Sequence, residues 1–309
     1  MTNESPVRLG LVGVGKIARD QHLPAIAANP HFELVATADP LGRVQDIPGY
    51  ASIEEMLAAN HVLDAVSIAT PPPGRGAIAG AAIEAGLDVM LEKPPAATLA
   101  EIGELEARAA AAGAILYTAW HSREAAGVTA ARDWLENRRI KSVNIAWRED
   151  IRRWHPGQDW ILAAGGFGVF DPGINALSIA TAILPEPIVV ESAELTIPAG
   201  RDSPIAAKLK MRSGAAAIAT EFDFLHEGPQ QWDIIVETDS GRLALHEGGR
   251  IIDINGSIAD GPDNEYSRLY ARFATLIRER QSDVDTAPLR IVADALRIGS
   301  RREGPEFNW

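Results

Sequence analysis

The N-terminal part of the chain alternates short apolar segments with segments of helical periodicity. The apolar segments predict buried strands over residues 7–12, 32–38, 64–69, 88–91 and 115–119. The intervening segments predict a helix that opens within residues 13–18 and ends near residue 29, helices over residues 53–60 and 78–85, and an alanine-rich helix ending near residue 112. This alternation is typical of an α/β domain with a parallel, doubly wound sheet.

The pattern changes after a helix predicted near residues 125–137. Longer segments that alternate polar and apolar residues predict strands over residues 142–147, 206–211, 215–224 and 232–237. Short turns at residues 212–214 and 239–241 join several of them as antiparallel hairpins. We therefore expect a second, α+β domain built on an open, mostly antiparallel sheet.

A glycine-rich segment follows the first predicted strand directly. Gly13, Gly15 and Ala18 match the G-x-G-x-x-G/A pattern, in which the glycines allow a tight turn and close approach to a pyrophosphate. The second strand ends near Asp39, whose carboxylate can accept from both ribose hydroxyls of an adenosine. We therefore predict a dinucleotide-binding Rossmann domain; the alternative is a Rossmann-like domain without a cofactor. The residues expected at the cofactor in this region are Gly13, Val14, Gly15, Lys16, Ile17 and Asp39.

Polar residues also follow three other predicted strands of this sheet. Thr70 and Pro71 follow one strand, Glu92 and Lys93 follow the next, and His121 follows the last. In open α/β sheets, ligands bind beyond the carboxyl ends of the strands. We therefore add the first four of these residues to the predicted cofactor site.

The chain of 309 residues is expected to form two domains. The first, residues 1–122, is the Rossmann domain, and the second, residues 123–309, binds the substrate and forms oligomer contacts. Helices are predicted over residues 266–279 and 289–297. These terminal helices could pack back on the first domain.

Composition excludes several classes of protein. The chain has no cysteine, which excludes disulfides and thiolate metal sites and fits a reducing cytoplasm. Its formal net charge of −13 argues against a nucleic-acid partner. No segment resembles a membrane span or a signal peptide, and no set of His, Asp and Glu residues has metal-ligand spacing. We expect a cytoplasmic protein without a metal.

Several segments together resemble one family. The turn GVGKIA at residues 13–18, the continuation HLPAI at residues 22–26 and Glu92-Lys93-Pro94 match the family of glucose–fructose oxidoreductase, inositol dehydrogenase and their relatives (Gfo/Idh/MocA). Within it, WREDIRRWHPGQDW at residues 147–160 and GVFDPGINALS at residues 168–178 resemble bacterial L-arabinose 1-dehydrogenases and D-galactose 1-dehydrogenases. The resemblance covers nearly the whole chain.

The resemblance implies an oxidoreductase that oxidises an aldopyranose at C1 to the lactone. The implied substrates are L-arabinose, D-galactose or D-fucose, with hydride transfer to NAD(P). Asp39 favours NAD, with NADP as the second choice, and the family expectation is a homo-oligomer, either a dimer or a tetramer. Two alternatives stay open: a non-catalytic sugar- or NAD-sensing regulator, and a family dehydrogenase that acts at another ring carbon.

Oxidation at C1 requires a base that removes the O1 proton. Lys93 is one candidate for this catalytic role, and Asp171 is the other, acting directly or by tuning Lys93. The structural alternative for Asp171 is a helix cap, because Asp-Pro is a common helix start. Many family members carry histidine where this chain has Asn175, and asparagine cannot take a proton at neutral pH.

The sugar hydroxyls need polar partners. We expect Glu149, His155 and Asn175 to bind them, and we include His121, for which a structural role is equally open. Trp154 and Trp160 are candidates for an aromatic wall, with core packing as the alternative.

Overall fold

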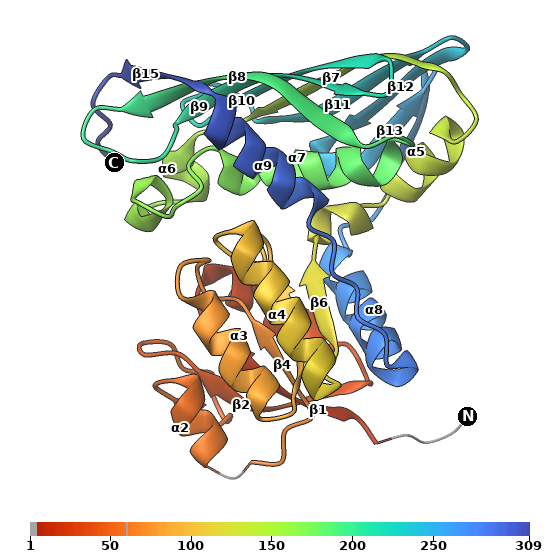
Figure 1. The fold of residues 1–309 in the computed structure, drawn as a ribbon. Coiled ribbons are helices and arrows are strands. Elements are labelled where there is room, and N and C mark those ends of the chain that lie inside the picture. Colours follow the sequence, from red (N-terminus) through yellow and green to blue (C-terminus); the bar gives the residue numbers. More distant parts are fainter. Residues whose placement is uncertain (1–4, 60) are drawn as a thin grey trace. The chain divides into compact units, whose positions relative to one another are not determined.

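A computed structural model describes residues 5–59 and 61–309 as two compact units (Figure 1). The described residues of the first unit are 5–59, 61–121 and 266–285, and the second unit comprises Ser122–Glu265 and Thr286–Trp309. The first unit thus includes a segment from late in the chain, and its first break follows His121 rather than residue 122.

A six-stranded parallel sheet forms the centre of the first unit, in the order β3-β2-β1-β4-β5-β6. Its strands are β1 (Val7–Val12), β2 (Phe32–Ala38), β3 (Gly49–Tyr50), β4 (Ala65–Ile68), β5 (Asp88–Glu92) and β6 (Leu116–Ala119). The predicted doubly wound sheet is confirmed, and only the short β3 was not predicted. The strand order reverses between β1 and β4, the point at which such sheets bind ligands beyond the strand ends.

Helices connect these strands, and α3 and α4 lie side by side on one face of the sheet (Figure 1). The helices are α1 (Leu23–Ala27), α2 (Ile53–Ala58), α3 (Arg75–Glu84) and α4 (Leu99–Ala112). The first predicted helix is interrupted: a π-helical turn (Ala18–His22) precedes α1, and Pro24 has no N–H to continue the α-helical ladder. The predicted end of the second helix, Asn60, lies outside the described residues.

Helix α8 (Glu265–Glu279) completes the core of the first unit. Its apolar face packs with Leu9, Phe32 and Tyr117 in one buried cluster. The Phe273 ring stacks on the Phe32 ring at 5.9 Å and on the Tyr117 ring at 6.1 Å between centroids. The sheet of the first unit is therefore covered in part by a helix that the chain contributes only after the second unit is almost complete.

A nine-stranded sheet forms the second unit, in the order β14-β13-β12-β11-β7-β10-β9-β8-β15. It is mostly antiparallel, as predicted, with parallel pairs at β7/β10 and β8/β15. Its strands are β7 (Ile140–Arg148), β8 (Ile188–Pro198), β9 (Ala206–Ser213), β10 (Ala216–Asp223), β11 (Gln231–Thr238), β12 (Gly241–His246), β13 (Ile251–Ile254), β14 (Ser257–Asp260) and β15 (Ser300–Gly304). The two predicted turns close the β9–β10 and β11–β12 hairpins.

Helices lie on one face of this second sheet (Figure 1). They are α5 (Val128–Leu135), α6 (Ile151–Trp154), α7 (Phe170–Ile183) and α9 (Ala287–Ile298). Along β9, buried and exposed residues alternate, as expected for a sheet with one covered face.

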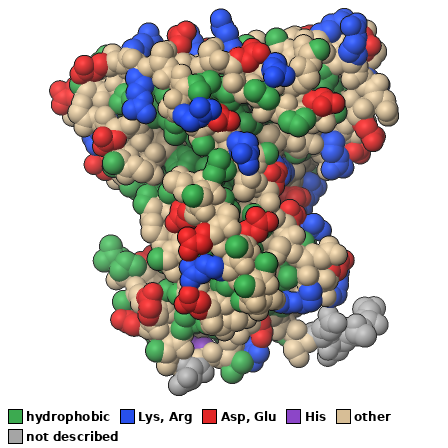
Figure 2. Space-filling model, viewed as in Figure 1, with side chains coloured by type: hydrophobic (Ala, Val, Ile, Leu, Met, Phe, Trp, Pro, Cys, Tyr) green, Lys and Arg blue, Asp and Glu red, His purple; other side chains and the backbone are tan. Residues whose placement is uncertain are grey.

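Acidic and basic side chains are intermingled on the surface of both units in the view of Figure 2. In the described part of the chain, no helix has the length and apolar character that a bilayer-spanning segment requires.

The position of α8 predicts that Phe273→Ala destabilises the first unit. Phe273 is fully buried, and truncation of a buried phenylalanine costs about 3–5 kcal/mol. Urea unfolding followed by circular dichroism measures the loss. The control is Val62→Ala, because Val62 is 62% exposed and should change the free energy of unfolding by less than about 0.5 kcal/mol. Equal unfolding midpoints for the two variants would contradict this packing.

Candidate active site

The glycine-rich loop after β1 passes close to the end of β4. Gly13 has a φ of +88°, and a Cβ at this position would lie 2.8 Å from the backbone nitrogen of Thr70. Glycine is therefore required both by conformation and by space. At Gly15, by contrast, no described atom beyond its chain neighbours lies within 4 Å of the Cβ position. The loop thus has open space where the motif is expected to meet a pyrophosphate.

Asp39 binds the same loop from the end of β2. Its carboxylate accepts hydrogen bonds from the backbone N–H groups of Val14 and Leu41, both at 2.8 Å, and from that of Gly42. Partial burial opposes ionisation, but these N–H groups and the charge of Arg43 outweigh it, so the pKa of Asp39 lies below its ordinary value. Asp39 is therefore an anion at neutral pH, held beside the loop where a ribose is expected.

The other predicted cofactor residues lie around this loop. Val14 is buried, whereas Ile17 is 38% exposed. Lys16 is exposed and forms an ion pair with Asp20. Pro71 is exposed beside Thr70 at the end of β4.

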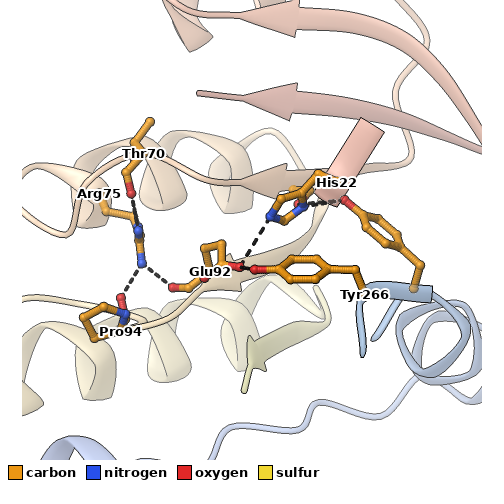
Figure 3. Close-up of polar contacts among 8 residues, drawn as sticks. His22, Thr70, Arg75, Glu92, Pro94 and Tyr266 are labelled. Atoms are coloured by element: carbon orange, nitrogen blue, oxygen red, sulfur yellow. Dashed lines mark hydrogen bonds and ion pairs between the residues drawn. The ribbon is translucent and has the colours of Figure 1, made fainter. Parts of the chain in front are cut away.

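Arg75, the first residue of α3, joins the ends of β4 and β5 (Figure 3). Its guanidinium donates to the carbonyl oxygen of Thr70, at 3.0 Å from Nε, and to the carbonyl oxygens of Glu92 and Pro94. Arg75 is only 2% exposed. The sequence interpretation missed it, because the helix was predicted to begin at residue 78, which left Arg75 in the preceding loop.

The Glu92 side chain points into the first unit (Figure 3). It is 3% exposed, accepts a hydrogen bond from the Tyr266 hydroxyl, and lies 3.4 Å from Nε2 of His22. On the other side of the ring, His22 Nδ1 lies 2.8 Å from the Tyr270 hydroxyl, which donates to Ser67. The carboxylate therefore belongs to a buried polar network, and the predicted contact of Glu92 with the cofactor stays a prediction.

Two opposing effects set the ionisation of Glu92. Burial alone would raise the pKa of its carboxyl group, because a charge is poorly solvated there. The facing His22 ring, together with the charges of His121 and Lys93, outweighs burial and lowers the pKa of Glu92 to about 2. Glu92 is therefore a carboxylate throughout the physiological range.

Lys93 follows directly and is partly buried at the end of β5. The peptide bond between Lys93 and Pro94 is cis. His121 lies in the same region, with its ring stacked on the Tyr266 ring at 5.2 Å between centroids. The structure therefore brings Glu92, Lys93 and His121 together at the carboxyl ends of β5 and β6.

Glu149 joins two side chains within the second unit. It follows β7, is 3% exposed, and accepts from the Trp232 indole nitrogen at 2.8 Å. Its other oxygen lies 3.2 Å from Nε2 of His155. The Trp232 ring also lies near the rings of Trp147 and Trp154, at 5.9 and 5.1 Å between centroids. Both oxygens of Glu149 thus contact protein groups, and its predicted contact with a sugar stays a prediction.

Asp171 and Asn175 lie one turn apart on α7, and therefore on the same face of the helix. Asp171 is 5% exposed. The N-cap position of α7 is Val169, whose side chain makes no capping hydrogen bond, and Asp171 lies in the first turn, so the alternative position of Asp171 at the N-cap is wrong. The start of α7 is fixed by Gly168, whose φ is +56° and where a Cβ would lie 2.1 Å from the Pro204 carbonyl oxygen.

Comparison with known proteins adds a second line of argument. The family model described as "Oxidoreductase family, NAD-binding Rossmann fold" matches residues 7–120. The chain is 45% identical to galactose 1-dehydrogenase of Pseudomonas fluorescens over 304 residues, which cover 96% of this chain and 97% of the relative. It belongs to this oxidoreductase family.

Two further matches extend the comparison. The crystal structure of a D-galactose-1-dehydrogenase protein from Rhizobium etli has a TM-score of 0.96 and 50% identity, and the match covers 100% of both chains. D-glucoside 3-dehydrogenase of Escherichia coli is 30% identical over 198 residues, which cover 60% of this chain and 56% of the relative. The NAD-binding oxidoreductase predicted from the sequence is therefore confirmed.

The depressed pKa of Glu92 predicts acid sensitivity. A folded pKa of about 2, below the ordinary 4.5, contributes stability that is present above about pH 5 and is lost as the pH falls toward 2. Between pH 5 and 3 we expect the wild type to lose about 2 kcal/mol more than Glu92→Gln, which cannot titrate. Urea titrations at each pH measure this difference.

The exposed Glu106 provides the control for this experiment. Glu106→Gln should keep the pH dependence of the wild type. Parallel pH profiles for the wild type and Glu92→Gln would show that Glu92 titrates alike in the folded and unfolded chains.

Proposed function

We propose that this protein oxidises an aldopyranose at C1 to the lactone, with NAD as its preferred cofactor. The observation that carries the proposal is the similarity, over nearly the full chain, to two proteins named as galactose 1-dehydrogenases. The proposed substrates are D-galactose, D-fucose and L-arabinose, which share ring stereochemistry at the carbons that bear their common hydroxyls.

The first unit fits a bound dinucleotide. Gly15 leaves open space for a pyrophosphate, and Asp39 presents an ionised carboxylate beside the same loop. When bound, the nicotinamide would accept the hydride that leaves C1 of the sugar. The protein's contribution is to hold the two reactants in one geometry, which can account for much of the rate enhancement.

The remaining chemistry is removal of the O1 proton. We propose that Lys93 and Asp171 carry it out, with one of them taking the proton and the other tuning or orienting it. His155, Asn175 and Glu149 are the proposed partners of the sugar hydroxyls. His121 is a further candidate, supported by its place beside Glu92 and Tyr266.

A second candidate function is oxidation at another ring carbon. It is favoured by the partial similarity to a D-glucoside 3-dehydrogenase. Product analysis separates the two functions, because oxidation at C1 gives a lactone and oxidation at C3 gives a keto sugar. A regulator without activity would show no absorbance change at 340 nm with any sugar and cofactor.

We predict that D-galactose, D-fucose and L-arabinose react and that D-glucose reacts poorly. Glucose inverts the C4 hydroxyl, which leaves a buried partner unpaired, and we expect its kcat/KM to be about 100-fold lower. Initial rates at 340 nm with a panel of aldoses, together with lactone detection, measure this. Lys93→Ala serves as the inactive control for these rates. With each sugar its kcat should be roughly 100-fold lower, while cofactor binding survives. Equal kcat/KM for glucose and galactose would contradict the proposed specificity.

We also predict a preference for NAD over NADP. The carboxylate of Asp39 would meet a 2′-phosphate with like charge, a repulsion on the order of 1 kcal/mol or more, which corresponds to about fivefold or more in kcat/KM. Arg43 donates to the carbonyl oxygens of Asp39 and Gly42, at 2.6 and 2.7 Å, so it is folded against the loop. Changing Asp39 to Ser and Pro40 to Arg should shift the preference toward NADP.

The measurement is kcat/KM for both cofactors in the wild type and the double variant. Arg43→Met serves as the control, since it removes the cation that lies beside Asp39 and should lower only residual NADP activity. A wild type that prefers NADP tenfold would mean that the carboxylate of Asp39 does not meet the ribose.

A further inference from the structure

Arg75 occupies an unfavourable place for a cation. It is the first residue of α3, where the helix dipole is positive, and it is only 2% exposed. Burial of a charged group costs free energy unless the groups around it compensate. The contacts of Arg75 must therefore offset the free-energy cost of burying its charge.

These contacts include main-chain carbonyl groups at the ends of two strands (Figure 3). Nε and Nη2 donate to Thr70 at the end of β4, while Nη1 donates to Glu92 and to Pro94 at the end of β5. The planar, forked guanidinium can bind these carbonyls at once, whereas an ammonium group is a single point donor.

The two carbonyls at β5 belong to the residues immediately before and after Lys93. Arg75 therefore holds the main chain on both sides of this lysine. The residue before it is fixed a second time, because the Glu92 carboxylate accepts from Tyr266 in the interior. The backbone at Lys93 is consequently held by Arg75 of α3 on one side and, through Glu92, by Tyr266 of α8 in the core.

We propose that Arg75 is a positioning residue for Lys93: by binding the carbonyl groups of Glu92 and Pro94, it fixes the direction in which the lysine side chain leaves the backbone. The proposal rests on the proposed function in that Lys93 is taken to act on the sugar. A displacement of about 1 Å at a reacting group can cost roughly 100-fold in rate, so loss of the fork should lower kcat.

The chain offers a control at the opposite end of β5, where the exposed Arg280 also uses its guanidinium to hold a strand end. Arg280 pairs with Asp88, the first residue of β5, at 2.6 Å and donates to the Gly113 carbonyl oxygen at 2.6 Å. Arg75→Lys and Arg280→Lys both keep the charge and both remove a guanidinium fork at one end of the same strand. Only the first change touches the residues that flank Lys93.

We expect Arg75→Lys to lower kcat for D-galactose by about 10- to 100-fold, with the Kd for NAD changed less than about threefold. Arg280→Lys should leave kcat within about twofold, even if it lowers the Tm. An equal loss of kcat in the two variants, in proportion to the Tm, would reduce Arg75 to a structural role and overturn the proposal.

A second readout does not depend on activity. The chain has five lysines, and the four others, Lys16, Lys141, Lys208 and Lys210, are exposed. After reductive methylation with ¹³C-formaldehyde, the Lys93 signal is assigned by its absence in Lys93→Arg, made in each background. We expect the chemical shift of this signal to change in Arg75→Lys and to remain unchanged in Arg280→Lys.

The two readouts separate the possible failures. If the wild type oxidises no sugar, the proposed function fails, and the Lys93 signal alone decides the positioning role. If that signal is unchanged in Arg75→Lys, the positioning role fails whatever the activity. Should Arg75→Lys not fold, the same measurements on Arg75→Gln, with Arg280→Gln as its control, lead to the same decisions.

Discussion

The buried carboxylate of Glu92 is the constraint on which the first unit depends. An ion of this kind is costly in an apolar interior unless it is paired and hydrogen-bonded. Its partners come from distant parts of the chain: His22 follows the glycine-rich loop, and Tyr266 lies on α8. Satisfying one charge therefore requires the loop, β5 and the returning helix to be in place together, so core formation and the placement of Lys93 are coupled.

The same arrangement explains how the site is held at a strand end. Strand ends are ordinarily the less constrained part of a sheet, because the ladder of hydrogen bonds stops there. In this unit the ends of β4 and β5 are joined through Arg75, and the loop after β1 is held by Asp39. Hydrogen bonds from the buried Arg75 and to the partly buried Asp39 thus hold the main chain where the hydrogen bonds of the sheet stop. This is also where a cofactor is expected.

The sequence was sufficient for the features with a strong period or motif. The five longer strands of the first unit are short apolar runs between turns, and the glycine motif requires the conformation seen at Gly13. It was insufficient for Glu92, because every residue of β5 is buried and no alternation shows which way a side chain points. The edge strand β15 was missed because its sequence, SRREG, has no apolar face.

Contacts between residues far apart in the sequence could not be predicted from local periodicity, for a different reason. The amphipathic character of α8 is readable, but the sheet that it covers lies more than a hundred residues earlier in the chain. Glu149 illustrates the same limit. The buried residues Val143, Ile145 and Trp147 alternate along β7, which places position 149 on the covered face, yet nothing local shows that Trp232 and His155 bind both its oxygens.

The similarity to known proteins is distributed according to the two units of the chain. The family model ends at residue 120, and the first unit gives way to the second after His121. The features that the model covers include the ones expected at a dinucleotide, namely the loop, Asp39 and the ends of β4 and β5. The two galactose 1-dehydrogenase matches extend through the second unit as well. Because a fold shared by many enzymes does not determine its substrate, the side chains of the second unit are where the choice of substrate should be sought.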